Sequence, residues 1–145
     1  MRLRLVAPGV TASRVGLERY LRVLTGALET LAAAAAAELV TNREIPLLYE
    51  SGCRYQREAR DRSGARLEEW RSPLAVCEAG AGDCEDLAAY RVAELRERLG
   101  EPSARFDVLS QEPRPGREHW LFHIRIRRQD GRLEDPSRLL GMTPE

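Results

Sequence analysis

The chain has 145 residues, of which 43% are apolar, enough for one domain with a hydrophobic core. Its 23 basic and 23 acidic residues cancel, so no overall charge favours binding to a nucleic acid or to an anionic membrane. All the basic residues are arginine, which leaves the α-amino group as the only amine of the chain that could accept an acyl group.

The N-terminal residues lack the apolar stretch of a signal peptide, because Pro8 and Gly9 interrupt it. The alanine-rich residues 31–40 are too few to span a bilayer. The cysteines at positions 53, 77 and 84 form an odd set, which argues against a disulfide framework in a chain without an export signal. We therefore expect a cytoplasmic protein that does not contact a membrane.

Two segments have apolar residues at helical spacing. The first follows a cap at Thr11 or Ser13 and continues to residues 41–42, which predicts one long helix. The second extends over residues 84–99 and ends at a glycine, which predicts another helix. Residues 43–70 between them are polar and show little periodicity, so we expect a mobile connection on the surface.

The C-terminal third has the pattern of strands. Residues 104–110 predict one strand, and residues 119–142 predict a strand, a glycine-containing turn and a second strand. Trp120, Phe122, Ile124 and Ile126 alternate along the middle strand and predict its core face. The order indicates an α+β fold in which the helices come first and a small antiparallel sheet follows.

Cys84 is expected at the first position of the second helix. Asp83 is a good N-cap, and the unpaired N–H groups and the positive end of the helix dipole favour a thiolate at position 84. Glu85 and Asp86 act in the opposite direction, because they disfavour a nearby negative charge. A cysteine in this position suits a nucleophile but needs a base and an orienting acid.

An acyl-transfer site also needs donors to an oxyanion. The Cys84 backbone N–H can supply one, and Gly80 and Gly82 allow other backbone to approach the sulfur. For a second donor, Gln56 and Trp70 are candidates by residue type only; surface or packing roles are the simpler interpretation of both.

The candidate bases are two histidines, and the C-terminal hairpin discriminates between them. A three-residue loop at 129–131 with Gly131 left-handed places Asp135 opposite Arg125 and diagonal to His123, about 7–8 Å away between Cα atoms. His119 would lie about 13 Å farther along the strand. A two-residue loop would instead place Asp135 opposite the next residue, on the face away from His123. The loop type therefore decides whether His123 and Asp135 can pair.

These motifs resemble a known superfamily. "GAGDCEDLA", a histidine on a strand and "DGRLEDPSR" resemble the Cys, His and Asp motifs of transglutaminase-like, papain-like cysteine enzymes. More narrowly, "YESGCRYQRE", "EEW", "GDCEDLAAYRVAELR", "FHIRI" and "DGRLEDPSRLLGM" resemble small transglutaminase-like proteins of phages and prophages. The resemblance implies one domain over residues 1–145. Its core covers residues 46–142, with a Cys-bearing helix on an antiparallel sheet, and residues 1–45 add a strand and a long helix.

The resemblance also implies roles for three residues. Cys84 would be the nucleophile, His123 the base and Asp135 the group that orients the imidazole. Many transglutaminase-like domains have a longer interval between histidine and aspartate and a tryptophan close after the histidine, which suits His119 and Trp120 better. We favour His123, on the hairpin register and on the "FHIRI" match, and retain His119 as the alternative base.

Other chemistries have weaker signals. The spacing of Cys77 and Cys84 lacks the close pairing of a structural zinc site, and no phosphate-binding glycine loop is present, so we expect no metal and no cofactor. The arginines of residues 125–128 lack stacking aromatics on their face, so we expect no nucleic-acid partner. The leading hypothesis is a cysteine-dependent enzyme that hydrolyses a peptide or isopeptide bond, or transfers the acyl group to an amine. The alternative is a non-catalytic phage virion or assembly protein with the same fold, bound to phage structural proteins.

Overall fold

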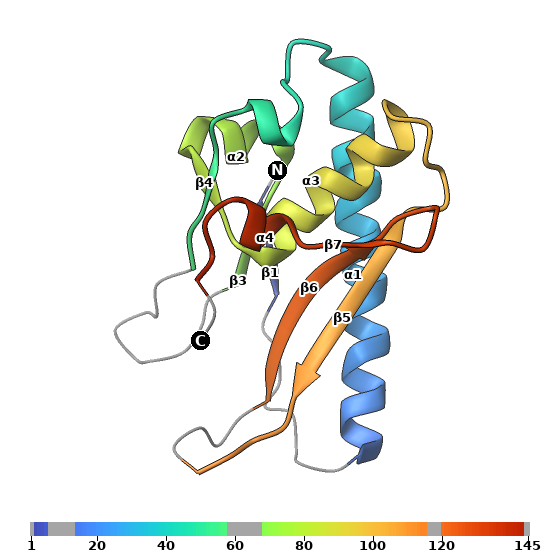
Figure 1. Cartoon of the computed structure of the whole chain (residues 1–145), viewed down its shortest axis with the longest axis vertical. Coiled ribbons are helices and arrows are strands. Elements are labelled where there is room, and N and C mark those ends of the chain that lie inside the picture. The colour runs from blue at the N-terminus through green and yellow to red at the C-terminus, as the bar shows by residue number, and fades with distance from the viewer. Residues whose placement is uncertain (1, 6–13, 58–67, 116–119, 144–145) are drawn as a thin grey trace.

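The computed structural model describes residues 2–5, 14–57, 68–115 and 120–143 and has an α+β architecture (Figure 1). A long N-terminal helix and a second, Cys84-bearing helix pack against a small antiparallel sheet. In chain order the elements are β1 (Arg2–Leu5), α1 (Arg14–Thr41), the short 3₁₀ helix η1 (Leu48–Glu50), β2 (Arg54–Tyr55), β3 (Glu68–Arg71), α2 (Pro73–Ala79), β4 (Ala81–Gly82), α3 (Cys84–Glu97), β5 (Arg105–Gln111), β6 (Leu121–Arg127), β7 (Leu133–Glu134) and α4 (Pro136–Leu139).

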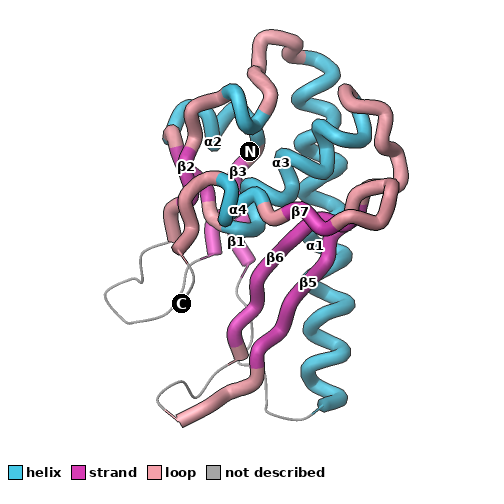
Figure 2. The backbone as a smooth tube through the Cα atoms, viewed as in Figure 1, coloured by secondary structure: helices cyan, strands magenta, loops and turns pink. Residues whose placement is uncertain are grey.

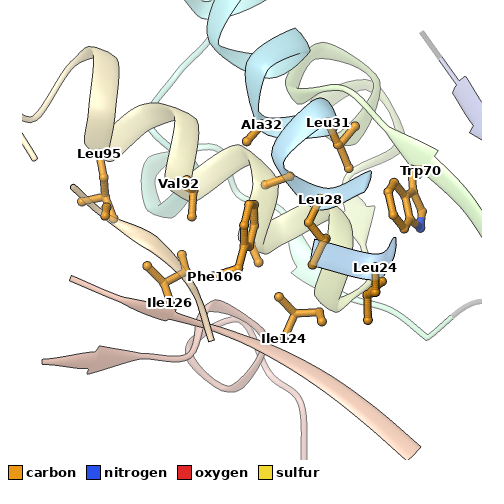
Figure 3. Close-up of a cluster of buried hydrophobic side chains, with 13 residues drawn as sticks. Leu24, Leu28, Leu31, Ala32, Trp70, Val92, Leu95, Phe106, Ile124 and Ile126 are labelled. Carbon is orange, nitrogen blue, oxygen red and sulfur yellow. The ribbon is translucent and has the colours of Figure 1, made fainter. Parts of the chain in front are cut away.

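The main hydrophobic core lies between α1, α3 and the sheet (Figure 3). Leu28 of α1, Val92 of α3 and Ile124 of β6 are fully buried in it. Both long helices are where the apolar spacing predicts them, since helical periodicity places such residues on one face. Because α1 supplies a large part of this core, it is an integral part of the fold rather than an addition to a finished domain.

The far end of α1 is tied to the far end of α3. Arg98, the C-cap of α3, donates to the backbone carbonyl oxygens of Ile45, Leu39 and Asn42, at 2.6, 2.8 and 3.1 Å. The last carbonyl groups of a helix have no partner within the helix. Arg98 binds one of these, the Leu39 carbonyl in the last turn of α1, and two carbonyls that follow the helix, those of Asn42 and Ile45. The two helices are thus joined by hydrogen bonds as well as by apolar packing.

By length and composition alone, the segment Val15–Thr41 of α1 would suffice for a membrane span or a signal sequence. Leu28, Leu31 and Leu39 of this helix are, however, at most 1% exposed and pack against the rest of the described protein. The core helix of a soluble protein passes the same test of length and composition.

The C-terminal sheet has the strand order β5-β6-β7 and is antiparallel throughout (Figure 2). Ile126 pairs with Glu134, and the Arg128 N–H donates to the Arg132 carbonyl at 2.8 Å. Gly131 has φ +86°, the left-handed conformation required at the last position of a three-residue loop. The predicted loop type and register of this hairpin are therefore confirmed.

The sequence predicts one strand within residues 1–45 besides those of the C-terminal third, and the structure has β2, β3 and β4 in addition. β1 pairs with β3 antiparallel, and β2 pairs with β4 in a two-residue parallel bridge. These strands are two to four residues long, too short to show the alternation from which strands are predicted. They surround the segment that leads into α3 and so hold the start of that helix.

The segment expected to be a surface connection also contains core residues. Ile45, Leu48, Cys53 and Trp70 are at most 3% exposed. They pack against residues of α1, α2 and α3. Because these tertiary contacts, and not a regular local element, decide which side chains are buried, the apolar residues show no local period. The helix α2, seven residues long, was likewise missed because it is too short for a recognisable period.

Candidate active site

Cys84 is the first residue of α3, as predicted, and its thiol is partly buried against the sheet. Asp83 is the N-cap: its Oδ1 accepts hydrogen bonds from the N–H groups of Glu85 and Asp86, both at 3.1 Å. The Cys84 sulfur faces the backbone N–H of Ile124 in β6, which favours the thiolate. The residue before Ile124 is His123, so the nucleophile candidate lies next to the strand that carries the base candidate.

The expectation of a thiolate at Cys84 is not met in the resting site. Burial raises the pKa of the Cys84 thiol well above its ordinary value, and the negative charges of Glu85 and Asp83 raise it further. The helix cap does not offset these effects through the N–H groups of Glu85 and Asp86, because Asp83 already accepts both. The thiol instead donates a hydrogen bond to Glu85 Oε2 at 2.9 Å.

His123 and Asp135 are in direct contact, with His123 Nε2 and Asp135 Oδ2 at 2.8 Å. Both side chains are partly buried, each 16% exposed. A carboxylate in this position accepts the proton of Nε2 and leaves Nδ1 as the ring nitrogen able to take another proton. The diagonal proximity that the hairpin register predicts is therefore present as a hydrogen bond.

Asp135 is held in place by the start of α4. Its Oδ1 accepts the backbone N–H of Arg138 at 3.2 Å, so the same carboxylate caps that short helix. Pro136 follows as the first helical residue and is buried, and Asp135 itself is extended, as expected before a proline. Oδ1 thus caps α4, while Oδ2 contacts both the imidazole and, at 3.4 Å, the Nε of Arg138.

Tyr55 is a residue of this site that sequence reasoning missed. Burial and the nearby Cys84 raise the pKa of the Tyr55 phenol to about 12, so the phenol stays protonated beside the sulfur. β2 brings it there, since Tyr55 pairs with Gly82, two residues before Cys84. No local pattern indicates this, because the bridge joins segments 27 residues apart and only two residues long. A phenol at this position can donate a hydrogen bond to a substrate oxygen.

Three further residues were named as possible site residues: Gln56, Trp70 and His119. The Gln56 backbone N–H donates to the Gly82 carbonyl at 2.9 Å, but its side chain is exposed. Trp70 is 1% exposed in the main core, and its indole N–H has no hydrogen-bond partner among the described residues. His119, the alternative base, lies outside the described residues.

Asp86, in the first turn of α3, is fully buried behind the nucleophile. Its Oδ1 accepts the Arg71 backbone N–H at 2.6 Å, while Oδ2 finds no partner in the described part of the chain. Burial and the neighbouring Asp83 raise the pKa of Asp86 to about 8. Gly82 allows this close packing, because a Cβ there would come within 3.0 Å of the Asp86 Cβ. Near neutral pH, Asp86 therefore keeps its proton.

We expect Asp86→Asn to remove a pH dependence of stability. Between pH 3.8 and about 8 the folded protein keeps a proton that the unfolded chain has lost, so wild-type stability falls as pH rises, by up to about 1.4 kcal/mol per pH unit. Asparagine has the shape of the protonated acid and does not titrate. Urea unfolding should give similar stability for variant and wild type below about pH 4, and a variant that becomes progressively more stable than the wild type between pH 5 and pH 8.

A control for this measurement is Glu78→Gln, at an exposed position of α2, which should leave the pH dependence as in the wild type. A constant stability difference between Asp86→Asn and the wild type from pH 5 to pH 8 would mean that Asp86 is ionised throughout, and would contradict the prediction.

The three cysteines are free thiols. Cys53 is buried and donates to the Val76 carbonyl at 3.5 Å, and the Cys77 sulfur lies 3.6 Å from the Tyr90 hydroxyl. Among the described residues, no three or more His, Cys, Asp or Glu side chains are grouped so that they could hold a metal ion.

Comparison of the chain with family models, with curated proteins and with solved structures finds no match. The interpretation of the site therefore depends on its own geometry: a helix-start cysteine that faces the Ile124 amide, and a hydrogen-bonded His123–Asp135 pair on the same sheet.

Proposed function

We propose that the protein is a cysteine-dependent acyl-transfer enzyme with a transglutaminase-like, papain-like core. The observation that carries the proposal is the His123–Asp135 hydrogen bond of 2.8 Å on the strand whose Ile124 amide faces the Cys84 sulfur. An imidazole oriented by a carboxylate beside a helix-start thiol is the arrangement that nucleophilic acyl transfer needs. The proposal includes the phage or prophage origin, the cytoplasmic location and the peptide or protein substrate that the sequence resemblance implies.

In the proposed reaction, His123 Nδ1 takes the thiol proton as the Cys84 sulfur attacks the carbonyl carbon of an amide. The C–S bond forms, and negative charge develops on the carbonyl oxygen near the Cys84 N–H and the Tyr55 phenol. The C–N bond then breaks, and the imidazolium returns its proton to the leaving amine. Asp135 holds Nε2–H throughout and stabilises the imidazolium.

The resulting thioester reacts with water or with an amine, and His123 removes the proton of the attacking molecule. We propose hydrolysis as the main outcome, since water needs no dedicated binding site. A peptide or isopeptide bond is the expected substrate class, because an amide carbonyl is the group on which the proposed steps act.

Alkylation of Cys84 by iodoacetamide tests the proposal without a known substrate. At pH 7 we expect the wild type to react at least about tenfold faster than His123→Ala, because an imidazole is the side chain suited to take the thiol proton near that pH. The pH profile should be followed by intact mass and the modified residue located by peptide mapping. His119→Ala is the matched control and should react like the wild type.

Two outcomes would count against this assignment. Equal rates in the wild type and in both histidine variants would remove the base from the proposed mechanism and favour the alternative, a non-catalytic virion or assembly protein. A slow His119→Ala together with a normal His123→Ala would assign the base to His119 instead.

A further inference from the structure

The Cys84 thiol has one proton, for which the site offers Glu85 and, in the proposed reaction, His123 as acceptors. In the resting site it donates to Glu85 Oε2 at 2.9 Å. In the reaction proposed above, the same proton must pass to the imidazole of His123. A thiol cannot donate one hydrogen to a carboxylate and to an imidazole at the same time, so the two acceptors compete.

Glu85 is a poor base for this proton. A carboxylate is ordinarily a much weaker base than a thiolate, so transfer of the proton to the carboxylate is disfavoured. The hydrogen bond therefore stabilises the thiol without ionising it. An imidazole, with an ordinary pKa of about 6.5, is a far better acceptor for the same proton.

A second carboxylate acts on the Cys84 thiol in the same direction as Glu85. Asp83 adds a second negative charge on the same helix turn, and the Tyr55 phenol on β2 is neutral near pH 7. On β6 the sulfur meets the Ile124 N–H, a dipole rather than a full charge. In the proposed reaction His123 becomes positively charged by taking the proton, and the Asp135 carboxylate stabilises that charge.

We infer that Glu85 is a positioning residue that holds the Cys84 thiol proton in the resting site and must release it before His123 can accept it. This inference rests on the proposed function, since it assigns Glu85 to the same nucleophile. It gives the free protein a protonated, weakly reactive thiol. Whatever moves the Glu85 carboxylate away from the sulfur then activates the nucleophile.

Two variants of Glu85 separate the hydrogen bond from the charge. Glu85→Gln keeps an acceptor oxygen and loses the charge, and Glu85→Ala loses both. We expect iodoacetamide to modify Cys84 fastest in Glu85→Ala, next fastest in Glu85→Gln and slowest in the wild type. At pH 7 the rate in Glu85→Ala should exceed the wild-type rate at least about tenfold, which is a decrease of one unit in the thiol pKa.

The shift of the pH profile distinguishes this role from a structural one. Glu97→Gln, at an exposed position near the end of the same helix, should leave the profile unchanged. Circular dichroism and urea unfolding would verify that each variant is folded. An unchanged or raised midpoint in folded Glu85→Gln and Glu85→Ala would overturn the inference, as would slower alkylation in either.

The double variant Glu85→Ala/His123→Ala separates a failure of this inference from a failure of the proposed function. If Glu85 competes with His123 for the proton, most of the acceleration in Glu85→Ala should disappear when His123 is also replaced. A full acceleration without His123 would mean that Glu85 acts on the thiol by charge alone, and would overturn the competition. If the midpoint of the Cys84 alkylation profile shifts in the Glu85 variants but not in His123→Ala, the proposed function loses its base. If it shifts in His123→Ala but not in the Glu85 variants, only the role assigned to Glu85 is lost.

Discussion

Replacing Cys84 with serine is expected to lower amide hydrolysis or acyl transfer at least about a thousandfold while leaving the fold intact. A hydroxyl is a far weaker acid than a thiol, and the partly buried site already disfavours ionisation at this position. The measurement is turnover of a fluorogenic peptide library for hydrolysis and incorporation of a fluorescent primary amine into casein for transfer. Serine is close in size, so urea unfolding should change little.

Cys77→Ser is the matched control for this prediction. Its thiol is also partly buried, but it lies in α2 beside Tyr90 and away from the His123–Asp135 pair. The control should keep the activity of the wild type. Equal turnover in Cys84→Ser and the wild type would remove Cys84 from the reaction and leave the fold with no assigned nucleophile.

The largest expected effect on stability belongs to Glu94, in the middle of α3. Glu94 is fully buried, accepts the Leu48 backbone N–H at 2.7 Å and pairs with Arg91. Arg91 Nε in turn donates to Glu134 at 2.7 Å, and the Tyr49 hydroxyl donates to the same carboxylate at 2.6 Å. This ionic network joins α3, η1 and β7. It includes Glu134, the residue directly before Asp135, and continues through Arg128 to Glu101.

Glu94→Ala should lower the free energy of unfolding by about 3–5 kcal/mol, because it leaves the Arg91 charge with one partner fewer and the Leu48 N–H with none. Urea denaturation at pH 7 measures the change. Glu97→Ala, one turn later on the exposed face, should alter stability by no more than about 0.5 kcal/mol. A loss below about 1 kcal/mol in Glu94→Ala would show that the network contributes little.

Sequence patterns are sufficient for the parts of the fold that repeat over many residues. α1 and α3 follow from apolar spacing over 28 and 14 residues. The hairpin of β6 and β7 follows from one residue, Gly131, whose conformation fixes the register. The two-residue bridge of β2 and β4 could not be predicted, since it depends on tertiary packing that no local pattern encodes.

The candidate site likewise has features that the sequence predicts and features that it does not. His123 and Asp135 are close in sequence across a hairpin, so their hydrogen bond could be predicted from strand geometry. The protonation of Cys84 could not, because it depends on burial by β6 and on where the Glu85 side chain lies. Tyr55 is brought near Cys84 by a long-range strand pairing, for which the sequence gives no local signal.

The contact between the two long helices limits how this protein can vary. Ala32 and Ala35 of α1 and Ala88 and Ala89 of α3 are at most 1% exposed, so side chains of a single carbon lie where the helices meet. The separation of packed helices depends on the size of the side chains between them. A larger residue at Ala32 would displace α3 and, with it, the Cys84 sulfur relative to β6. The distance between the proposed nucleophile and the proposed base thus depends on positions that have no chemistry of their own.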